Sequence, residues 1–227
     1  MSDLGEIRTV FFDLDGVLVD SSVAIPRSIN YALERQGLAP RPEQSLHSSI
    51  GSPLLQAFRE ILEAEAADPG LAEACVESYR ERYRETCLDE TTLMPGVEGA
   101  VRRLSEQRTL AVVTAKPDAF ARPILEKLGI ADCFALIVGP PLDPGRQEAK
   151  TLTLERAMGA LGLEVPSSGA PSPGAMVGDR HFDVLAGSAM RLVTVGVSWG
   201  IGSVSELRHA GADYIVQSPA ELVRLFS

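Results

Sequence analysis

The sequence has 227 residues, 45% of them hydrophobic and 23% charged, and a formal net charge of −10. A chain of this length can bury a full core in one large domain, or in one domain with an insertion. The acidic charge argues against nucleic acid or an anionic membrane surface as the main partner, and no apolar run is long enough to span a bilayer.

The first predicted element is a strand over 10–12 that runs directly into Asp13 and Asp15. Its unbroken apolar residues are typical of a parallel strand covered by helices on both faces. Residues i and i+2 of a strand share a face, and ligands bind beyond the carboxyl ends of such strands. The two carboxylates are therefore expected at a binding site, where their mutual repulsion favours a hard cation such as Mg²⁺.

The next segment, 21–91, is predicted to be helical throughout. Apolar residues recur at helical spacing, and Gly37 ends the first run. Ser52 is expected to cap a second helix that begins at Pro53. The predicted helices cover 25–36, 53–65 and 71–86.

Helices and strands alternate from residue 97 onwards. Strands are predicted over 109–113, 135–138, 175–177, 192–197 and 213–216, with helices over 97–107, 119–128, 151–161, 182–189, 203–210 and 219–226. This alternation is the mark of a doubly wound, Rossmann-like α/β domain with a parallel sheet. The predicted organisation is an α/β core formed by 1–20 and 92–227, with an inserted all-helical cap formed by 21–91.

Polar residues stand at four predicted strand ends. They are Asp13 with Asp15, Thr114, Lys150 after the third strand, and Asp179 with Asp183. The run Asp-x-Asp-Gly-Val-Leu-x-Asp-Ser from Asp13, and Gly-Asp followed four residues later by a second Asp from Gly178, resemble motifs of the haloacid-dehalogenase-like phosphatases. The stretches 50–54 and 138–143 are similar to a subgroup that spans phosphoglycolate-phosphatase-like and 5′-nucleotidase-like members.

This resemblance implies roles for individual residues. Asp13 would be the nucleophile that forms an aspartyl-phosphate, and Asp15 the acid and base. Asp13, Asp179 and the Asp15 carbonyl would hold Mg²⁺, and Asp183 would orient a ligand or the lysine. The phosphoryl oxygens would be bound by Thr114, Lys150 and the backbone amides of Leu14, Asp15 and Ala115.

The choice of lysine is open between two residues. The chain has only three lysines, and Lys127 is expected on a surface helix. Lys150 is preferred because it opens a helix after the third strand, where the resemblance places a lysine. Lys116 could also reach the site from its position after Thr114, or could face solvent.

Substrate selection is assigned to the cap, through Ile50, Gly51 and Ser52. A polar Ser52 would suit a hydroxylated or carboxylated leaving group. We expect a 5′-nucleotide or sugar phosphate ahead of phosphoglycolate. Arg180 is interpreted as a solvated charge and His181 as a residue at the rim of the site.

Four alternatives to a phosphatase remain. A phosphomutase would use the same core, whereas a dehalogenase has no need of Asp15 as an acid. The cap and the Asp13-x-Asp15 spacing argue against a signalling receiver domain, and the intact motifs argue against a non-catalytic regulator.

The expected partner is a small phosphorylated metabolite, with no nucleic acid or membrane, bound by a monomer or weak homodimer. The lack of signal-peptide features and of paired cysteines predicts the cytoplasm.

Overall fold

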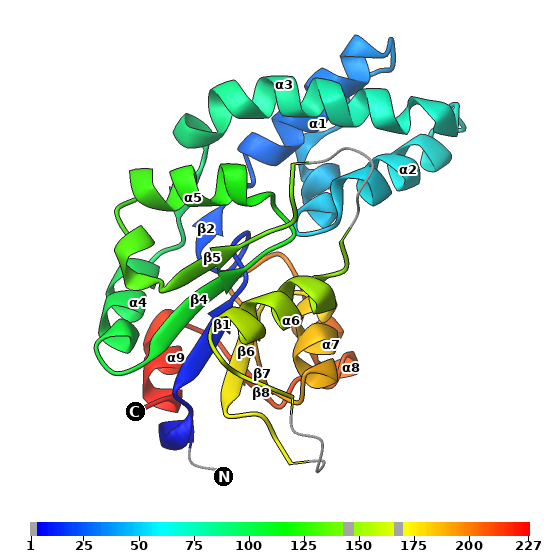
Figure 1. Cartoon of the computed structure of the whole chain (residues 1–227). Coiled ribbons are helices and arrows are strands. Elements are labelled where there is room, and N and C mark those ends of the chain that lie inside the picture. The colour runs from blue at the N-terminus through cyan, green and yellow to red at the C-terminus, as the bar shows by residue number, and fades with distance from the viewer. Residues whose placement is uncertain (1–3, 143–147, 166–169) are drawn as a thin grey trace.

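The computed structural model describes residues 4–142, 148–165 and 170–227, and its main element is a parallel sheet of six strands (Figure 1). The strand order is β5-β4-β1-β6-β7-β8, and every neighbouring pair in this sheet is parallel. The predicted α/β fold class is confirmed. The strands are β1 (Thr9–Phe12), β4 (Thr109–Val113), β5 (Leu136–Val138), β6 (Gly174–Gly178), β7 (Val193–Val197) and β8 (Tyr214–Val216).

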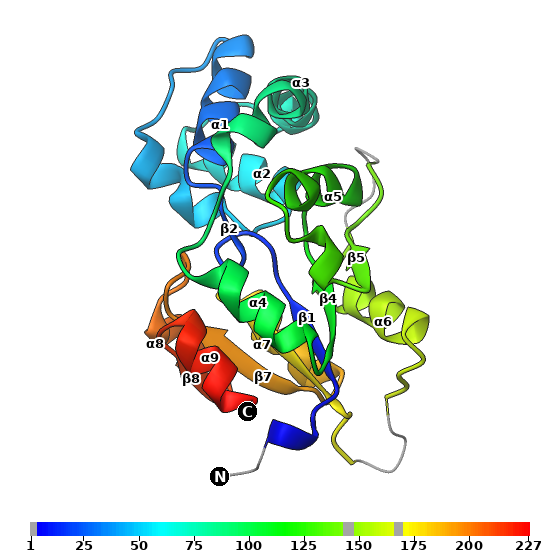
Figure 2. The same ribbon diagram turned by 90° about the vertical axis from the view of Figure 1, so that its left-hand side faces the viewer.

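Helices cover both faces of the sheet (Figure 2). Val10 and Phe12 of β1 belong to a core shared with α4 (Val97–Ser105), α5 (Asp118–Lys127) and α9 (Pro219–Leu225). Phe11 points the opposite way, into a core shared with α6 (Lys150–Ala160) and α7 (His181–Ala189). This period of two explains why the first strand is apolar throughout. A further helix, α8 (Val204–His209), packs Leu207 close to Gly196 of β7.

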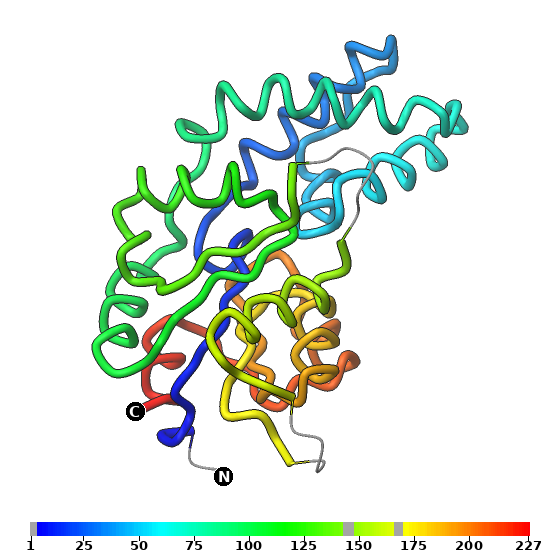
Figure 3. Tube along the Cα trace, in the orientation of Figure 1, coloured from blue at the N-terminus to red at the C-terminus, as the bar shows by residue number. Residues whose placement is uncertain are grey.

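The helical segment lies beyond the carboxyl ends of the strands, at the top of Figure 1. The tube in Figure 3 shows the chain leaving the core after β1 and returning before α4. Two short antiparallel strands, β2 (Val19–Asp20) and β3 (Thr92–Leu93), join where the chain leaves and returns. The segment contains α1 (Ala24–Arg35), α2 (Leu54–Ala64) and α3 (Ala72–Glu90). The described residues also form the 3₁₀ helices η1 (Leu4–Glu6), η2 (Glu43–Ser49), η3 (Pro69–Leu71) and η4 (Ala131–Cys133).

Two details of the helical segment differ from the sequence prediction. Ser52 does not cap the second helix, because Pro53 itself occupies the cap position with an extended ψ of 125° and the helix begins at Leu54. The third helix runs four residues beyond Thr86, to Glu90 (90 − 86 = 4), and Cys87 in this last turn is buried.

Asp143, the last residue of the predicted stretch 138–143, lies outside the described residues. Among the described helices, none is both long and apolar enough to cross a membrane.

Candidate active site

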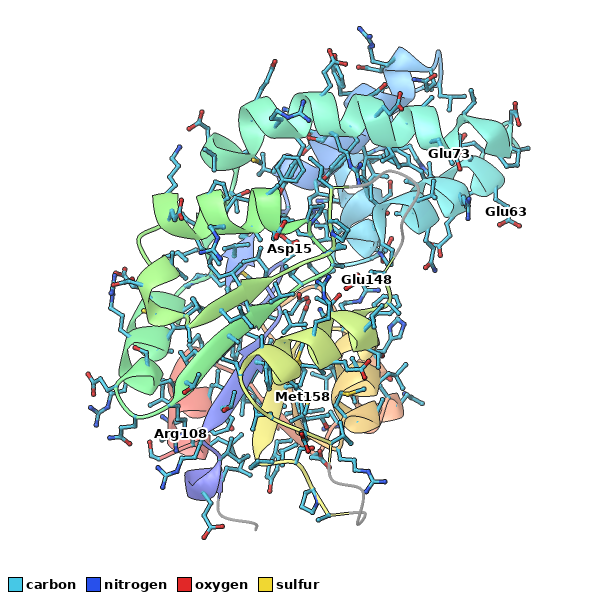
Figure 4. All side chains as sticks on the ribbon, viewed as in Figure 1. Asp15, Glu63, Glu73, Arg108, Glu148 and Met158 are labelled. Carbon is cyan, nitrogen blue, oxygen red and sulfur yellow. The ribbon has the colours of Figure 1, made fainter. Side chains whose placement is uncertain are left out.

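Asp13 and Asp15 follow β1 and turn their side chains toward different partners. The backbone N–H of Asp13 donates to the carbonyl of Val177 at 2.9 Å, which extends the pairing of β1 with β6. Asp13 is 2% exposed and Asp15 is 5% exposed. Figure 4 places Asp15 between the sheet and the helical segment, close to Glu148. The strand end therefore presents two buried carboxylates, as expected, but with separate surroundings.

Asp13 belongs to a cluster of three carboxylates and one lysine. The ammonium of Lys150 lies 2.7 Å from Asp13 Oδ1 and also pairs with Asp183 Oδ1. Oxygen atoms of Asp13, Asp179 and Asp183 lie within 4.8 Å of one another, and all three residues are buried. The carboxyl ends of β1 and β6 meet here, so residues 166 positions apart in the sequence share one site (179 − 13 = 166).

Burial is the largest influence on the titration of this cluster. It raises the pKa of Asp13 to about 8, with Lys150 opposing it and the charges of Asp183 and Asp179 adding to it. Burial and the charge of Asp183 raise the pKa of Asp179 to about 6. Burial disfavours the charged form of Lys150, but the carboxylates outweigh it and raise the pKa of its ammonium. One ammonium does not fully compensate three carboxylates, so the cluster favours an additional cation.

The carboxylate of Asp179 is held by hydrogen bonds to one of its two oxygens only, among the described residues. Its Oδ2 accepts from the backbone N–H groups of Ile201 at 2.7 Å and Gly202 at 3.3 Å. Its Oδ1 is buried without a hydrogen-bond partner among the described residues. A buried carboxylate oxygen without a partner is costly. Oxygen donors from several carboxylates suit a hard divalent cation, so this cluster fits Mg²⁺.

Asp15 forms a second charged pair, 2.6 Å from the ammonium of Lys116. The hydroxyl of Ser21 also donates to Asp15 Oδ1. Lys116 is 7% exposed and lies 5.2 Å from the centre of the Tyr83 ring on α3. Of the two orientations left open for Lys116, the structure therefore shows the one that reaches the site. Sequence reasoning missed Ser21, although it ends the quoted first motif.

The residues expected to bind phosphoryl oxygens lie around these two pairs. Thr114 follows β4, is 1% exposed, and accepts from the backbone N–H of Lys116 at 3.1 Å. Ala115 lines a cavity with Asp15 and a second cavity with Lys150. Leu14 follows Asp13 directly, and its side chain is buried in the core.

The first cavity, of about 100 Å³, lies between the helical segment and the core. Gly51 and Ser52 line it, whereas Ile50 is fully buried and is not among the lining residues. Glu148, which the sequence analysis did not single out, also lines it and accepts from the hydroxyl of Thr153 at 2.9 Å. Further lining comes from Tyr79, Tyr83, Lys116, Pro117 and Phe120. The cavity therefore offers aromatic and aliphatic walls with an ion pair on one side.

Arg180 is not the solvated charge that the sequence suggested. Its side chain is 13% exposed and pairs with Glu206 of α8 at 3.0 Å. Its guanidinium also donates to the carbonyls of Ile50 at 2.8 Å and Ser48 at 3.1 Å. These two hydrogen bonds connect the core with the helical segment. His181 lies beside Arg180, with Nδ1 2.6 Å from Glu206 Oε1. No pattern in the sequence indicates that an arginine at this position turns toward the helical segment.

Several known proteins are similar to this chain in sequence and in structure. The family model described as haloacid dehalogenase-like hydrolase matches residues 10–197. A phosphoglycolate phosphatase of Chromobacterium violaceum is 35% identical, over 98% of this chain and 98% of the relative. A 5′-nucleotidase of Pseudomonas aeruginosa is 35% identical, over 88% of this chain and 86% of the relative. The crystal structure of a "predicted phosphatase" from Clostridium acetobutylicum superimposes with a TM-score of 0.86 at 33% identity, covering 96% of this chain and 97% of the other.

Proposed function

This chain belongs to the haloacid dehalogenase-like hydrolase family, and we propose that it is a magnesium-dependent phosphatase of small phosphorylated metabolites. We propose that it acts through an aspartyl-phosphate on Asp13. The supporting observation is the separation of the two carboxylates: Asp13 lies with Lys150, and Asp15 lies with Lys116 at the cavity. One carboxylate is thus available as nucleophile and the other as acid and base.

In the first half of the reaction, Asp13 attacks phosphorus. A bond forms between a carboxylate oxygen of Asp13 and phosphorus, and the bond from phosphorus to the leaving oxygen breaks. Asp15 gives its proton to that oxygen, so the leaving group departs as an alcohol. Lys150 lies against Asp13 and stabilises the negative charge shared between nucleophile and phosphoryl group.

In the second half, water cleaves the aspartyl-phosphate. Asp15, now ionised, accepts a proton from the water as its oxygen bonds to phosphorus, and the bond from phosphorus to Asp13 breaks. Inorganic phosphate leaves, Asp13 is again a carboxylate and Asp15 is again protonated. The hydroxyl of Thr114 and the backbone amides of Leu14, Asp15 and Ala115 are proposed to hold the phosphoryl oxygens during both steps.

The proposed metal ligands are the carboxylates of Asp13 and Asp179 with the backbone carbonyl of Asp15. Asp183 is proposed to orient Lys150, with which it pairs. A bound Mg²⁺ would neutralise charge on the phosphoryl group.

Removal of the metal is expected to silence the enzyme. EDTA should abolish hydrolysis of p-nitrophenyl phosphate and added Mg²⁺ should restore it. Asp179→Ala should raise the Mg²⁺ concentration for half-maximal activity by at least about tenfold. Asp132→Ala, whose side chain is 74% exposed near Arg102, is the control and should leave this concentration unchanged. Full activity in metal-free enzyme would contradict the assignment of the cluster.

The cavity bears on the identity of the leaving group. A volume of about 100 Å³ suits a group of a few non-hydrogen atoms, such as glycolate, better than a nucleoside. A nucleotide would have to extend toward the second cavity, of about 470 Å³, that adjoins Gly51 and Lys150. Our proposal therefore reverses the order expected from the sequence and puts a small, hydroxylated or carboxylated phosphate ester first. Purified enzyme assayed on phosphoglycolate, sugar phosphates and 5′-nucleotides tests this order, and preference for nucleotides would reject it.

The helical segment 21–91 is proposed to act as a cap that closes over substrate, with 19–22 and 91–95 as hinges. Closure would exclude water and so strengthen the electrostatic contacts within the site. The pairing of β2 with β3 holds the two connections side by side, which supports their movement as one unit.

Ser52 lines the cavity without capping α2, so its hydroxyl is available to a leaving group. Ser52→Ala is expected to lower kcat/KM for a hydroxylated or carboxylated ester by roughly 3- to 10-fold, the value of one hydrogen bond. Hydrolysis of p-nitrophenyl phosphate, which offers no such group beside the scissile bond, should change less. Steady-state kinetics on both esters checks this, and an equal decrease for both would assign Ser52 a structural role only.

A further inference from the structure

Arg180 connects the carboxylate cluster with the helical segment. It directly follows Asp179, and its backbone N–H donates to Asp183 Oδ2 at 3.0 Å. Lys150 pairs with the other oxygen of the same Asp183 carboxylate. The backbone of Arg180 is therefore fixed by a residue of the proposed active site, while its side chain extends away from that site.

The far end of the Arg180 side chain binds the last turn of η2. Its Nη1 donates to the carbonyls of Ser48 at 3.1 Å and Ile50 at 2.8 Å. Carbonyls at the end of a helical turn have no partner within the turn, and a cation there is favourable. The residues that follow, Gly51 and Ser52, line the cavity. The Arg180 guanidinium thus holds the backbone of Ser48 and Ile50, directly before residues that line the cavity.

The guanidinium is also held from the core side. Its Nε donates to Glu206 Oε1 at 3.0 Å, and the same oxygen accepts from the backbone N–H of His181 at 2.9 Å. Burial would raise the pKa of Glu206, but the hydrogen bonds from His181 and Arg180 outweigh it and lower the pKa to about 2. Glu206 is therefore ionised at neutral pH and keeps its pair with Arg180.

The aliphatic part of the Arg180 side chain passes between two glycines. A Cβ at Gly51 would lie 3.6 Å from Arg180 Cγ, and a Cβ at Gly202 would lie 3.1 Å from Arg180 Cδ. Gly202 also closely approaches the carbonyl of Asp179, where a Cβ would lie 1.8 Å from the oxygen and cannot fit. The side chain therefore lies in a close-fitting passage between core and helical segment.

We propose that Arg180 is a positioning residue that holds residues 48–52 over the cavity and so sets which leaving groups the enzyme accepts. Its effect on substrate choice rests on the proposed phosphatase function, whereas its effect on the loop does not. Arginine is required because one planar group must reach Glu206 through Nε and two carbonyls through Nη1. A lysine offers a single point of attachment and cannot span these partners.

Amide hydrogen exchange tests the loop directly and needs no activity. The N–H of Ile50 bonds to the carbonyl of His47, and that of Ser52 bonds to the carbonyl of Ser49. In Arg180→Ala and Arg180→Lys, exchange at these two amides should rise at least about tenfold, because the turn loses its anchor. Amides of β6 should keep their wild-type exchange.

A matched control and a second variant separate positioning from folding. Arg59→Ala removes an arginine of α2 whose side chain is 57% exposed and whose guanidinium lies 3.5 Å from Glu73, and it should leave exchange at Ile50 and Ser52 unchanged. If Arg180→Ala fails to fold, Glu206→Gln supplies the test, because it weakens the core anchor and leaves Arg180 in place. Unchanged exchange at Ile50 and Ser52 in all folded variants would overturn the proposal, as would an equal rise in β6.

Kinetics then tests the effect on substrate choice. In Arg180→Lys, the ratio of kcat/KM for phosphoglycolate to kcat/KM for p-nitrophenyl phosphate should fall at least about fivefold, mainly through a higher KM for phosphoglycolate. Equal loss on both esters, or full activity on both with lysine, would overturn this part of the proposal. Failure of the phosphatase function would instead appear as absent hydrolysis in the wild-type enzyme, with the exchange result intact.

Discussion

Asp13→Asn is expected to lower kcat/KM by about 10⁴-fold or more, the scale seen when a covalent nucleophile is removed. An amide is a far poorer nucleophile than a carboxylate and cannot form the proposed aspartyl-phosphate. It also removes one of the three charges available to a cation and the partner that lies 2.7 Å from Lys150. The fold should survive, because the two side chains have the same shape and Lys150 keeps its pair with Asp183.

Three measurements check this prediction together. Steady-state hydrolysis of p-nitrophenyl phosphate gives the loss of rate, and acid-quenched intact mass spectrometry should show a phosphorylated species in wild type only. Circular dichroism should show the same spectrum for both proteins. Asp89→Asn, a matched change on a side chain that is 79% exposed, should behave as wild type in all three. Near-normal turnover in pure Asp13→Asn would refute covalent catalysis by this residue.

The fold could be predicted because its signals are local and repeated. Val10 to Phe12 are apolar on both faces, and helices cover both faces. Alternation of helix and strand from residue 97 onwards has few solutions other than a parallel sheet. The start of α2 could not be predicted in the same way. Pro53 occupies the cap position in an extended conformation, and nothing local distinguishes this from proline in the first turn.

Asp13 and Asp179 of the candidate site could be predicted from the sequence because they follow directly after strands β1 and β6. The backbone direction there fixes where Asp13 and Asp179 point, and parallel strands end at one edge. The directions of the Lys116 and Arg180 side chains could not be predicted in this way. Each residue has a long flexible side chain in a connection between elements, and its direction depends on partners far away in the sequence, Asp15 and Ile50. Such contacts depend on tertiary packing, which a pattern of residue types does not specify.

The two site lysines are expected to differ in their contribution to catalysis. Lys150→Ala should lower kcat by about 10²- to 10³-fold, the usual loss for one electrostatic contact to the transition state. Its ammonium lies among the carboxylates of Asp13 and Asp183, so its removal leaves the proposed nucleophile beside like charges with no ammonium to compensate them. Lys116→Ala should cost less, because Asp15 is the one carboxylate paired with Lys116 among the described residues, and Lys116 lies on the side proposed for the leaving group.

Measuring kcat and KM for both variants at saturating Mg²⁺ decides the ranking, since Mg²⁺ bound at the proposed site would compensate the carboxylates and stabilise both folded proteins. Lys150→Met retains most of the side-chain volume and separates loss of charge from loss of packing, so it should lower kcat as much as Lys150→Ala does. Lys127→Ala, which removes a lysine whose side chain is 46% exposed near Asp89, is the surface control. If Lys116→Ala instead lowered kcat more than Lys150→Ala, charge compensation at the leaving oxygen would outweigh that at the nucleophile. Lys116 would then take the role that we give to Lys150.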